Sequence, residues 1–558
     1  MKVTVDGVGP VTLGQGDFLA QGGEGAVYVR GTIAYKVYNT LGKMIPEGKI
    51  SELASIQNVR VIKPDRIIRD ASNRAIGYTM RYVSDTQALC RMFTRDFRDR
   101  NGVDHALALK IIRSLQDNVK DTHAAGVLVV DLNELNFLLA KSLDEVFSID
   151  VDSYQTRSFR ATALMESVRD RHAALNTFNT GTDWFAFAIV SFQLFVGIHP
   201  YKGKHPTLKD LDARMSNNVS VLDSAVRVPH VCYPFSVIPS AYFDWYRAVL
   251  QDGKRVPPPD GLVAATAAVA TSIVRGVTSG SITITELIRF GETPRAVYVS
   301  VDHVVGVLQD GVELRGQVMR LPIKNREVTV GFVAPLNDPV VVWIDGESLR
   351  LFDVAADRDL PITVNASALM TYEGRIYAKS GERIVEVCFH GVRQRRIASV
   401  TVAGNVMEHA SQVLDGVVIQ SLLGAMWISI FPQSGQCVQV RVRELDGYRV
   451  VAAKYDRGVL VVVGNRAGQY DKLIFDVPVD SARLVKCVAD VDSTPPNFVV
   501  TDSGVCATID ENEELVLAKG GKERRVADTA IGGDMRLVRH EGRVAFVRGD
   551  QLYRLTVS

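Results

Sequence analysis

Apolar and polar residues alternate with two different periods along the first half of the chain. Over residues 1–85 apolar residues recur at every second position in short runs, which predicts a small antiparallel sheet with one inserted helix. From residue 104 to 252 they recur at every third and fourth position, and WFAFAIVSFQLFV has the composition of a buried helix. The pattern therefore predicts a β-rich part followed by a helical part.

The helical spacing ends beyond residue 292, where short β-rich runs alternate with Gly, Asp and Asn turns. Equivalent runs open at Gly374, Gly416, Gly458 and Gly542, so the first two intervals are equal and the third is twice as long. A period of about 40 residues in an all-β segment is typical of the four-stranded blade of a propeller. We therefore expect 293–558 to form a β-propeller, with seven blades favoured over six and a pair of β-sandwiches as the alternative.

A boundary separates the helical part from the expected propeller. The PPPD stretch at 257–260 interrupts the helical spacing and an Ala-rich stretch follows it, so we expect a helical linker over 261–292. The longest apolar run, LVAATAAVATSIV, is too short to span a bilayer, and the first residues of the chain alternate as a strand does rather than as a signal peptide. The sequence thus predicts a soluble, cytoplasmic, multidomain α+β protein.

Three residues suited to phosphoryl transfer lie in VVDLNELNFLLAKSLDEVFSIDVDSYQT, residues 129–156. Asn136 follows Asp131 by five positions, and Asp150 comes fourteen positions later. Transfer from ATP needs one carboxylate to orient the acceptor hydroxyl and two oxygen ligands to hold Mg²⁺ against the phosphates. Asp131 is therefore the candidate catalytic residue. Asn136 and Asp150 are the candidate magnesium ligands, with Asp152 as the alternative to Asp150.

A glycine-rich turn precedes these residues. FLAQGGEGAVY, residues 18–28, lies between apolar alternations and is followed by the short strand IAYKV, which carries Lys36. Glycines let backbone N–H groups come close to phosphate oxygens. In the pattern G-x-G-x-x-G-x-V, the second and third glycines fall on Gly22 and Gly25 and the valine falls on Val27.

In this order the motifs resemble those of a protein kinase domain, over residues 14 to about 260. The segments YKVY, GYTMRYV, DLNELN and DVDSYQ more narrowly resemble a divergent bacterial and phage kinase-like family, in which Asp-x-Asp-Ser-Phe-Gln replaces Asp-Phe-Gly. The resemblance implies a bilobal kinase-like domain at 1–260, with a small lobe at about 1–83 and a large lobe at about 84–260. It also implies ATP and Mg²⁺ as cofactors.

The resemblance implies further roles in nucleotide binding. Lys36 takes the place of the lysine that pairs with the ATP phosphates, and its partner on the following helix is Glu47, with Glu52 as the alternative. Backbone groups of the segment that contains Met80 and Tyr82 would bind adenine.

Two segments downstream complete the resemblance, and three features depart from it. Asp183 takes the place of the buried aspartate in the helix after the activation segment, and DGKRVPPP resembles the arginine-containing close of the large lobe. Val130 stands where an arginine would pair with an activation-segment phosphate, and Asn133 stands where a lysine would contact the transferred phosphoryl group. The activation segment, from Asp150 to Met165–Glu166 in the place of Ala-Pro-Glu, is short for docking a peptide.

The missing arginine predicts that any activity is independent of phosphorylation of this segment, because an ordered phosphate needs a cation to pair with. The segment has five possible acceptors, namely Ser153, Tyr154, Thr156, Ser158 and Thr162.

Composition narrows the classes of partner. Lys and Arg number 64 against 63 Asp and Glu, so the overall charge implies no nucleic-acid partner. Six cysteines lie far apart with no C-x-x-C pair, which argues against a disulfide framework and against a zinc site. The apolar pattern implies no membrane partner.

The leading hypothesis is an ATP- and Mg²⁺-dependent protein kinase-like phosphotransferase, with a Ser/Thr-type acceptor favoured over Tyr. Its propeller would recruit a protein substrate or anchor the enzyme in an assembly, because propeller loops usually bind proteins. One alternative is a catalytically weak or inactive kinase-fold scaffold, such as a phage virion component, found in the host cytoplasm or the virion. A small-molecule phosphotransferase is the second alternative.

Overall fold

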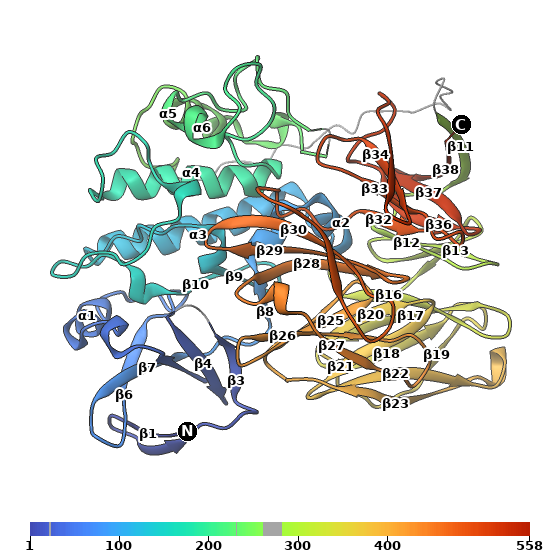
Figure 1. The fold of residues 1–558 in the computed structure, drawn as a ribbon, viewed down its shortest axis with the longest axis horizontal. Coiled ribbons are helices and arrows are strands. Elements are labelled where there is room, and N and C mark those ends of the chain that lie inside the picture. Colours follow the sequence, from blue (N-terminus) through green and yellow to red (C-terminus); the bar gives the residue numbers. More distant parts are fainter. Residues whose placement is uncertain (22–23, 230, 261–281, 558) are drawn as a thin grey trace. The chain divides into compact units, whose positions relative to one another are not determined.

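The computed structural model describes residues 1–21, 24–229, 231–260 and 282–557. It divides into two compact units, one made mostly of residues before 271 and the other mostly of residues after it (Figure 1). Gly22 and the larger part of the expected linker, residues 261–281, lie outside the described residues.

A seven-stranded antiparallel sheet opens the first unit, in the order β2-β1-β6-β7-β5-β4-β3. Alternate residues such as Val3, Val5, Val37 and Ile68 are buried on one face, which confirms the predicted period of two. The strands are β1 (Lys2–Val5), β2 (Gly9–Thr12), β3 (Phe18–Gln21), β4 (Gly25–Arg30), β5 (Ile33–Tyr38), β6 (Pro64–Arg69) and β7 (Ala75–Arg81).

The inserted helix of this lobe is α1 (Glu47–Leu53), which follows β5 and the short turn η1 (Leu41–Lys43). Leu53 is fully buried, whereas Glu47 is exposed at the first position of α1.

Helices dominate the rest of the first unit. α3 and α4 pack side by side, and the N-cap of each is a polar side chain: Asp104 accepts from the Leu107 N–H at 2.7 Å, and Asn179 forms a capping box with Thr182 (Figure 1). Nearly every residue of α4 is buried, as its continuous apolar sequence predicts.

The helices of this region are α2 (Arg95–Asn101), α3 (His105–Ala124), α4 (Thr180–Val196), α5 (Leu211–Ser216) and α6 (Ser240–Leu250). Between them lie a small sheet of β8 (Thr86–Ala88), β9 (Phe137–Ala140) and β10 (Val146–Ser148), and the 3₁₀ turns η2 (Leu89–Phe93), η3 (Glu134–Asn136), η4 (Val151–Ser153), η5 (Glu166–Val168) and η6 (Phe235–Val237).

The described residues of the second unit form seven four-stranded antiparallel sheets, consistent with a seven-bladed β-propeller and with the count favoured from the sequence. The first four sheets are β12 (Ala296–Val299), β13 (Val304–Val307), β14 (Gly311–Leu314), β15 (Gln317–Arg320); β16 (Val328–Val333), β17 (Asp338–Asp345), β18 (Ser348–Asp353), β19 (Arg358–Leu360); β20 (Ala368–Tyr372), β21 (Arg375–Ser380), β22 (Arg383–His390), β23 (Ile397–Asn405); and β24 (Ser411–Leu414), β25 (Val417–Leu422), β26 (Ala425–Ile430), β27 (Val438–Arg441). Two 3₁₀ turns, η7 (Arg393–Arg395) and η8 (Arg443–Leu445), accompany them.

Two further sheets follow, and one more joins distant segments of the sequence. They are β28 (Arg449–Asp456), β29 (Val459–Arg466), β30 (Gln469–Asp476), β31 (Arg483–Val488); β32 (Phe498–Val500), β33 (Cys506–Ile509), β34 (Leu515–Lys519), β35 (Lys522–Val526); and β11 (Ile282–Arg289) with β38 (Gln551–Val557), β37 (Arg543–Arg548) and β36 (Arg536–His540).

The periodic glycines lie at equivalent hairpin turns. Gly374, Gly416, Gly458 and Gly542 each stand between the first and second strands of their sheet, with φ between 70° and 85°. Two-residue hairpin turns need a positive φ, which glycine adopts without strain. The period in the sequence is therefore the period of the sheets.

The expected helical linker is wrong for its described residues. Residues 282–289 form strand β11, which pairs with β38 from Ile282 opposite Val557 to Arg289 opposite Gln551. Ile282 and Ile284 are buried and alternate with exposed Thr283 and Thr285, a period of two that the preceding Ala-rich stretch obscured. The second unit consequently begins before residue 293.

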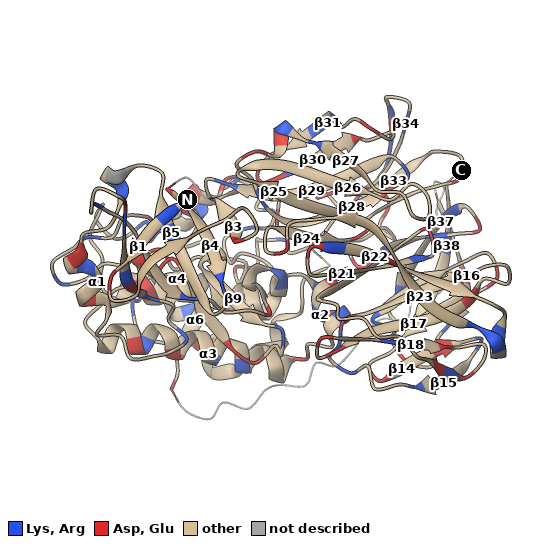
Figure 2. Cartoon of the chain, turned by 90° about the horizontal axis from the view of Figure 1, so that it is seen from below, with Lys and Arg blue, Asp and Glu red and all other residues tan. Residues whose placement is uncertain are grey.

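The remaining expectations about composition concern charge, cysteines and the membrane. Basic and acidic side chains are interspersed over each unit (Figure 2), and all six cysteines are free. In the part of the chain that the structure describes, no helix is long and apolar enough to cross a membrane.

Candidate functional site

A buried aspartate of α4 holds the loop that carries the candidate catalytic residue. Asp183 is fully buried, and its two carboxylate oxygens accept hydrogen bonds from the backbone N–H groups of Val129 at 2.8 Å and Val130 at 2.9 Å. A buried carboxylate is stable only when donors satisfy it. These bonds fix the backbone immediately before Asp131, as the resemblance implied for Asp183.

His123 supplies the third donor to this aspartate. Its Nε2 lies 2.8 Å from Oδ2 of Asp183, and its ring packs edge-on against Trp184 at 5.1 Å between centroids. Because a carboxylate only accepts hydrogen bonds, Nε2 carries the proton. The sequence reading missed His123, since a single histidine in the last turn of α3 has no motif around it.

The residue before Asp131 has an unfavourable backbone conformation. Val130 has φ of 63°, in the left-handed region that a β-branched residue rarely adopts. Such conformations persist where surrounding contacts impose them, and here the hydrogen bond from Val130 to Asp183 does so. The strained turn directs Asp131 toward Asn136 and the activation segment.

Asp131 and Asn136 are in direct contact. Nδ2 of Asn136 donates to the Asp131 carbonyl at 2.9 Å and to its Oδ2 at 3.1 Å, and each residue is 8 % exposed. Oδ1 of Asp131 accepts from the N–H of Met165 at 2.7 Å, so the activation segment lies against this carboxylate. Within the described residues no donor reaches Oδ1 of Asn136, which leaves that oxygen for a cation.

Asp150 and Asp152 stand on either side of the first residue of η4. Asp150 is in the left-handed region at φ 54°, and its side chain is 53 % exposed, so its carboxylate is open to a bound ion. Its Oδ1 lies 3.6 Å from Nζ of Lys36. Asp152, by contrast, is buried. This difference supports Asp150 over Asp152 as the magnesium ligand, because a cation bound with ATP phosphates needs an accessible oxygen.

Lys36 is anchored by Asp152. Its Nζ lies 2.6 Å from Oδ2 of Asp152, which also accepts a hydrogen bond from the hydroxyl of Tyr38 at 2.6 Å. Burial opposes the charge of Asp152, but the Lys36 ammonium and the hydrogen bonds outweigh it and hold the pKa of Asp152 below its ordinary value. Burial likewise opposes the Lys36 charge, yet Asp152 and then Asp150 raise the pKa of Lys36.

The expected helix partner of Lys36 is wrong. Glu47 lies exposed on α1 with Oε1 3.2 Å from Nη2 of Arg69, and Oε2 of the alternative, Glu52, accepts from the Ser158 N–H at 3.1 Å. Neither glutamate is an ion-pair partner of Lys36, and Asp152 takes their place. Sequence spacing suggested a helix residue because the actual partner lies far along the chain, in another lobe.

The other expected nucleotide contacts lie around the same sheet. Gly25 begins β4, where a Cβ would meet the Val37 carbonyl at 2.5 Å, so close packing of β4 on β5 requires this glycine. Val27 pairs with Lys36 across the two strands and is half-buried, as is Met80 near the end of β7. The N–H of Tyr82 donates to the Thr32 carbonyl at 2.8 Å.

Arg255 lies in the segment that resembles the close of the large lobe and is held by an ion pair. Arg255 forms a two-bond ion pair with Asp170, at 2.5 Å and 2.6 Å, and its guanidinium stacks 4.5 Å from the ring centroid of Phe185. Glu166, which stands in the place of the glutamate of Ala-Pro-Glu, pairs with Arg169 and Arg171. The ion pair with Arg255 fixes Asp170, which lies just beyond this motif.

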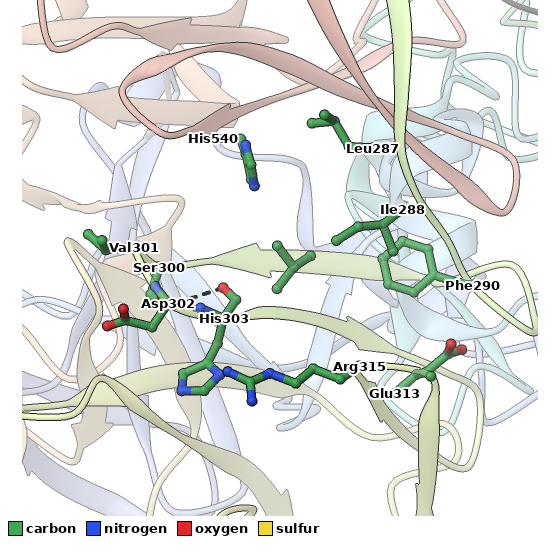
Figure 3. Close-up of a pocket in the computed structure, with 12 residues that line it drawn as sticks. Leu287, Ile288, Phe290, Ser300, Val301, Asp302, His303, Glu313, Arg315 and His540 are labelled. Carbon is green, nitrogen blue, oxygen red and sulfur yellow. Dashed lines mark hydrogen bonds between the residues drawn. The ribbon is translucent and has the colours of Figure 1, made fainter.

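The second unit contains a separate cavity of about 450 Å³. His303, just before β13, and His540, at the end of β36, point toward it, and Arg315 lies beside His303 (Figure 3). The Nδ1 atoms of both histidines are buried and have no hydrogen-bond partner in the described part of the chain. Apolar walls come from β11 and its neighbours, namely Leu287, Ile288, Phe290 and Val304. Within the described residues, no three His, Cys, Asp or Glu side chains are placed to hold a metal ion, here or elsewhere.

Comparisons with known proteins add distant structural likenesses. No protein-family model matches the chain, and no curated protein matches it. Among solved structures, the kinase PK-1 of Cydia pomonella granulovirus is similar, at 17 % identity and a TM-score of 0.32, over 42 % of this chain and 85 % of that one.

Proposed function

We propose that the first unit is an ATP- and Mg²⁺-dependent protein kinase-like phosphotransferase. The observation that supports it most is the meeting of Lys36, Asp150 and Asp152 at η4, together with the Asp131–Asn136 contact on a loop anchored by Asp183. These groups are far apart in sequence, and each has the chemistry that one part of phosphoryl transfer requires.

Each residue has a separate role in this proposal. The Lys36 ammonium binds phosphate oxygens of ATP, and the Asp150 carboxylate with Oδ1 of Asn136 would hold Mg²⁺, which neutralises charge that develops on the phosphates. Asp131 accepts a hydrogen bond from the acceptor hydroxyl and aligns its oxygen with the γ-phosphorus. A Ser/Thr-type acceptor is favoured.

Adenine would lie between β4 and the segment after β7. Val27 and Met80 are half-buried apolar side chains on these strands and suit a planar base. Tyr82 lies in the same segment, and its N–H is bonded to the Thr32 carbonyl. The second unit would recruit a protein substrate or anchor the enzyme, since propeller loops form rigid binding surfaces.

A scaffold without turnover is the second candidate, and one contact favours it. The Met165 N–H already occupies Oδ1 of Asp131, and Asn133, which replaces a phosphate-binding lysine, is buried with its amide bonded to the local backbone. Both features reduce the groups available to an acceptor. Each carboxylate oxygen has two lone pairs, however, so Asp131 retains capacity for a hydroxyl.

Incubation of the full chain with labelled ATP and Mg²⁺ tests the proposal, with casein as protein acceptor and free serine as small-molecule acceptor. Asp131→Ala should lower transfer by about 10³-fold and Asp150→Ala by at least as much. Asp252→Ala, an exposed aspartate of the same unit, is the matched control and should retain wild-type activity. Nucleotide binding without transfer would support the scaffold, and transfer to serine alone would support a small-molecule phosphotransferase.

A further inference from the structure

The closest ion pair of Lys36 is built from two parts of the chain that no kinase motif connects. The side chains of Lys36 and Asp152 are 10 % and 4 % exposed, and 2.6 Å separates Nζ from Oδ2. A pair so little exposed is disrupted strongly when one partner is removed, because the other charge stays buried without compensation. The contact therefore fixes the lysine in one place.

Two tyrosines complete the surroundings of this pair. The Tyr38 hydroxyl donates to the same oxygen of Asp152, and Nζ of Lys36 lies 5.4 Å and 5.9 Å from the ring centroids of Tyr38 and Tyr78. Oδ1 of Asp152 has no hydrogen-bond partner in the part of the chain that the structure describes. Lys36 and Tyr38 thus both contact the same oxygen of Asp152, Oδ2.

The carboxylates of α1 are engaged elsewhere. Glu47 pairs with Arg69, and Glu52 accepts a hydrogen bond from the backbone of Ser158. Neither glutamate therefore pairs with Lys36. The Lys36 anchor consequently uses neither of these two carboxylates.

We propose that Asp152 is the positioning residue for Lys36 and replaces a glutamate of the helix. This inference rests on the proposed function. Since Asp150 and Asp152 belong to one short turn, the lysine that binds phosphate and the ligand that binds Mg²⁺ are set by the same element. Assembly of the nucleotide site then depends on η4 and needs no carboxylate from α1.

A double-mutant cycle measured on the full chain tests the inference. Asp152→Asn should lower kcat/KM for ATP about 100-fold, the size expected when a phosphate-binding group is misplaced. Lys36→Met should lower it at least as much. The double variant should lose no more than Lys36→Met alone, because Asp152 acts through the ammonium. Independent losses that multiply in the double variant would overturn the proposal.

Two further measurements separate positioning from other roles. Glu47→Gln should stay within twofold of wild type, and a tenfold loss there would restore the helix glutamate as partner. The Mg²⁺ concentration for half-maximal activity should be unchanged in Asp152→Asn, whereas a rise comparable with that of Asp150→Ala would make Asp152 a metal ligand and overturn the proposal.

Folding and function can be told apart in the same experiment. Asp152→Asn could unfold because the buried Lys36 loses its closer partner. The double variant carries neither charge, so a comparison of its activity with that of Lys36→Met still tests whether Asp152 acts through Lys36. A wild type that neither binds nor uses Mg·ATP would overturn the proposed function and this inference with it. An active wild type with an equally active, folded Asp152→Asn would overturn the inference alone.

Discussion

The two units are held together by different kinds of interaction. In the first, single buried polar contacts such as those of Asp183 and Asp152 occur once each and join segments far apart in sequence. In the second, one hairpin geometry recurs with glycines at matching turns, and each sheet repeats the arrangement of the last. The difference indicates that one substitution can remove the function of the first unit, whereas the second distributes its stability over many similar contacts.

The largest expected effect comes from removing the anchor of the catalytic loop. Asp183→Ala leaves the N–H groups of Val129 and Val130 and Nε2 of His123 without an acceptor, and the strained turn before Asp131 loses its support. We expect phosphoryl transfer to fall about 10³-fold, about 4 kcal/mol of barrier. Labelled-ATP assays measure this, with Asp183→Asn as an intermediate variant that keeps one oxygen acceptor. Full activity of Asp183→Ala would contradict the comparison.

The buried ion pairs of Arg396 test whether the second unit, with its repeated sheets, also depends on single contacts. Arg396 is fully buried and pairs with Asp353 at 2.6 Å and Asp338 at 2.7 Å. Arg396→Met leaves two buried carboxylates without this cation, so we expect a loss of about 3 kcal/mol in the free energy of unfolding of the second unit. Urea unfolding and hydrogen exchange of β17 and β18 measure it, with the exposed Arg383→Met as control. A loss below about 1 kcal/mol is typical of an ordinary substitution. It would show that the repeated sheets keep the second unit stable even without this contact.

Acid should weaken the first unit through the Asp170–Arg255 pair. Burial opposes the charge of Asp170, but the hydrogen bonds and charge of Arg255 prevail, so the pKa of this carboxyl is lowered on folding. Its contribution to the free energy of unfolding is therefore present above the unfolded pKa of about 4 and is lost as pH falls through the folded pKa. Asp170→Asn should be less stable than wild type at pH 7, and the gap should close in acid. A gap that persists at pH 2 would refute the pairing.

The smallest expected effect is that of dephosphorylation. Of the five possible acceptors in the activation segment, Ser153, Tyr154 and Thr156 are buried, and only Ser158 and Thr162 are exposed. No arginine precedes Asp131 to order a phosphate. Phosphatase treatment, and alanine at both exposed acceptors, should change activity less than twofold. A tenfold loss, about 1.4 kcal/mol of barrier, would identify the segment as a switch.

Short sequence patterns predicted those parts of the fold that depend on residues close together in the sequence. The glycines at 374, 416 and 458 mark hairpins that need a positive φ, and the period of two in the first strands places Val3 and Val5 in the core. Strand β11 was missed because its partner β38 stands at the opposite end of the second unit's sequence, so no neighbouring pattern distinguished a strand from a linker.

The residues of the candidate site also fall into two groups, those that sequence spacing predicted and those that it did not. Asp131 and Asn136 are five positions apart and were found by spacing, as was Asp150. The partner of Lys36 was not found from the sequence because the carboxylate that pairs with it is selected by tertiary packing rather than by distance along the chain. His123 gave no signal, since an isolated histidine in a helix is equally compatible with a structural role.

The pairing of β11 with β38 has a consequence for the order of events during synthesis. Ile282 emerges from the ribosome before all six intervening sheets, and its partner Val557 emerges after them. Until then β11 presents an unpaired strand edge while the intervening sheets form, and unpaired edges favour association between chains. Pairing between strands so far apart in sequence is slow. Completion of this sheet is therefore the step at which nascent chains are most exposed to misassembly.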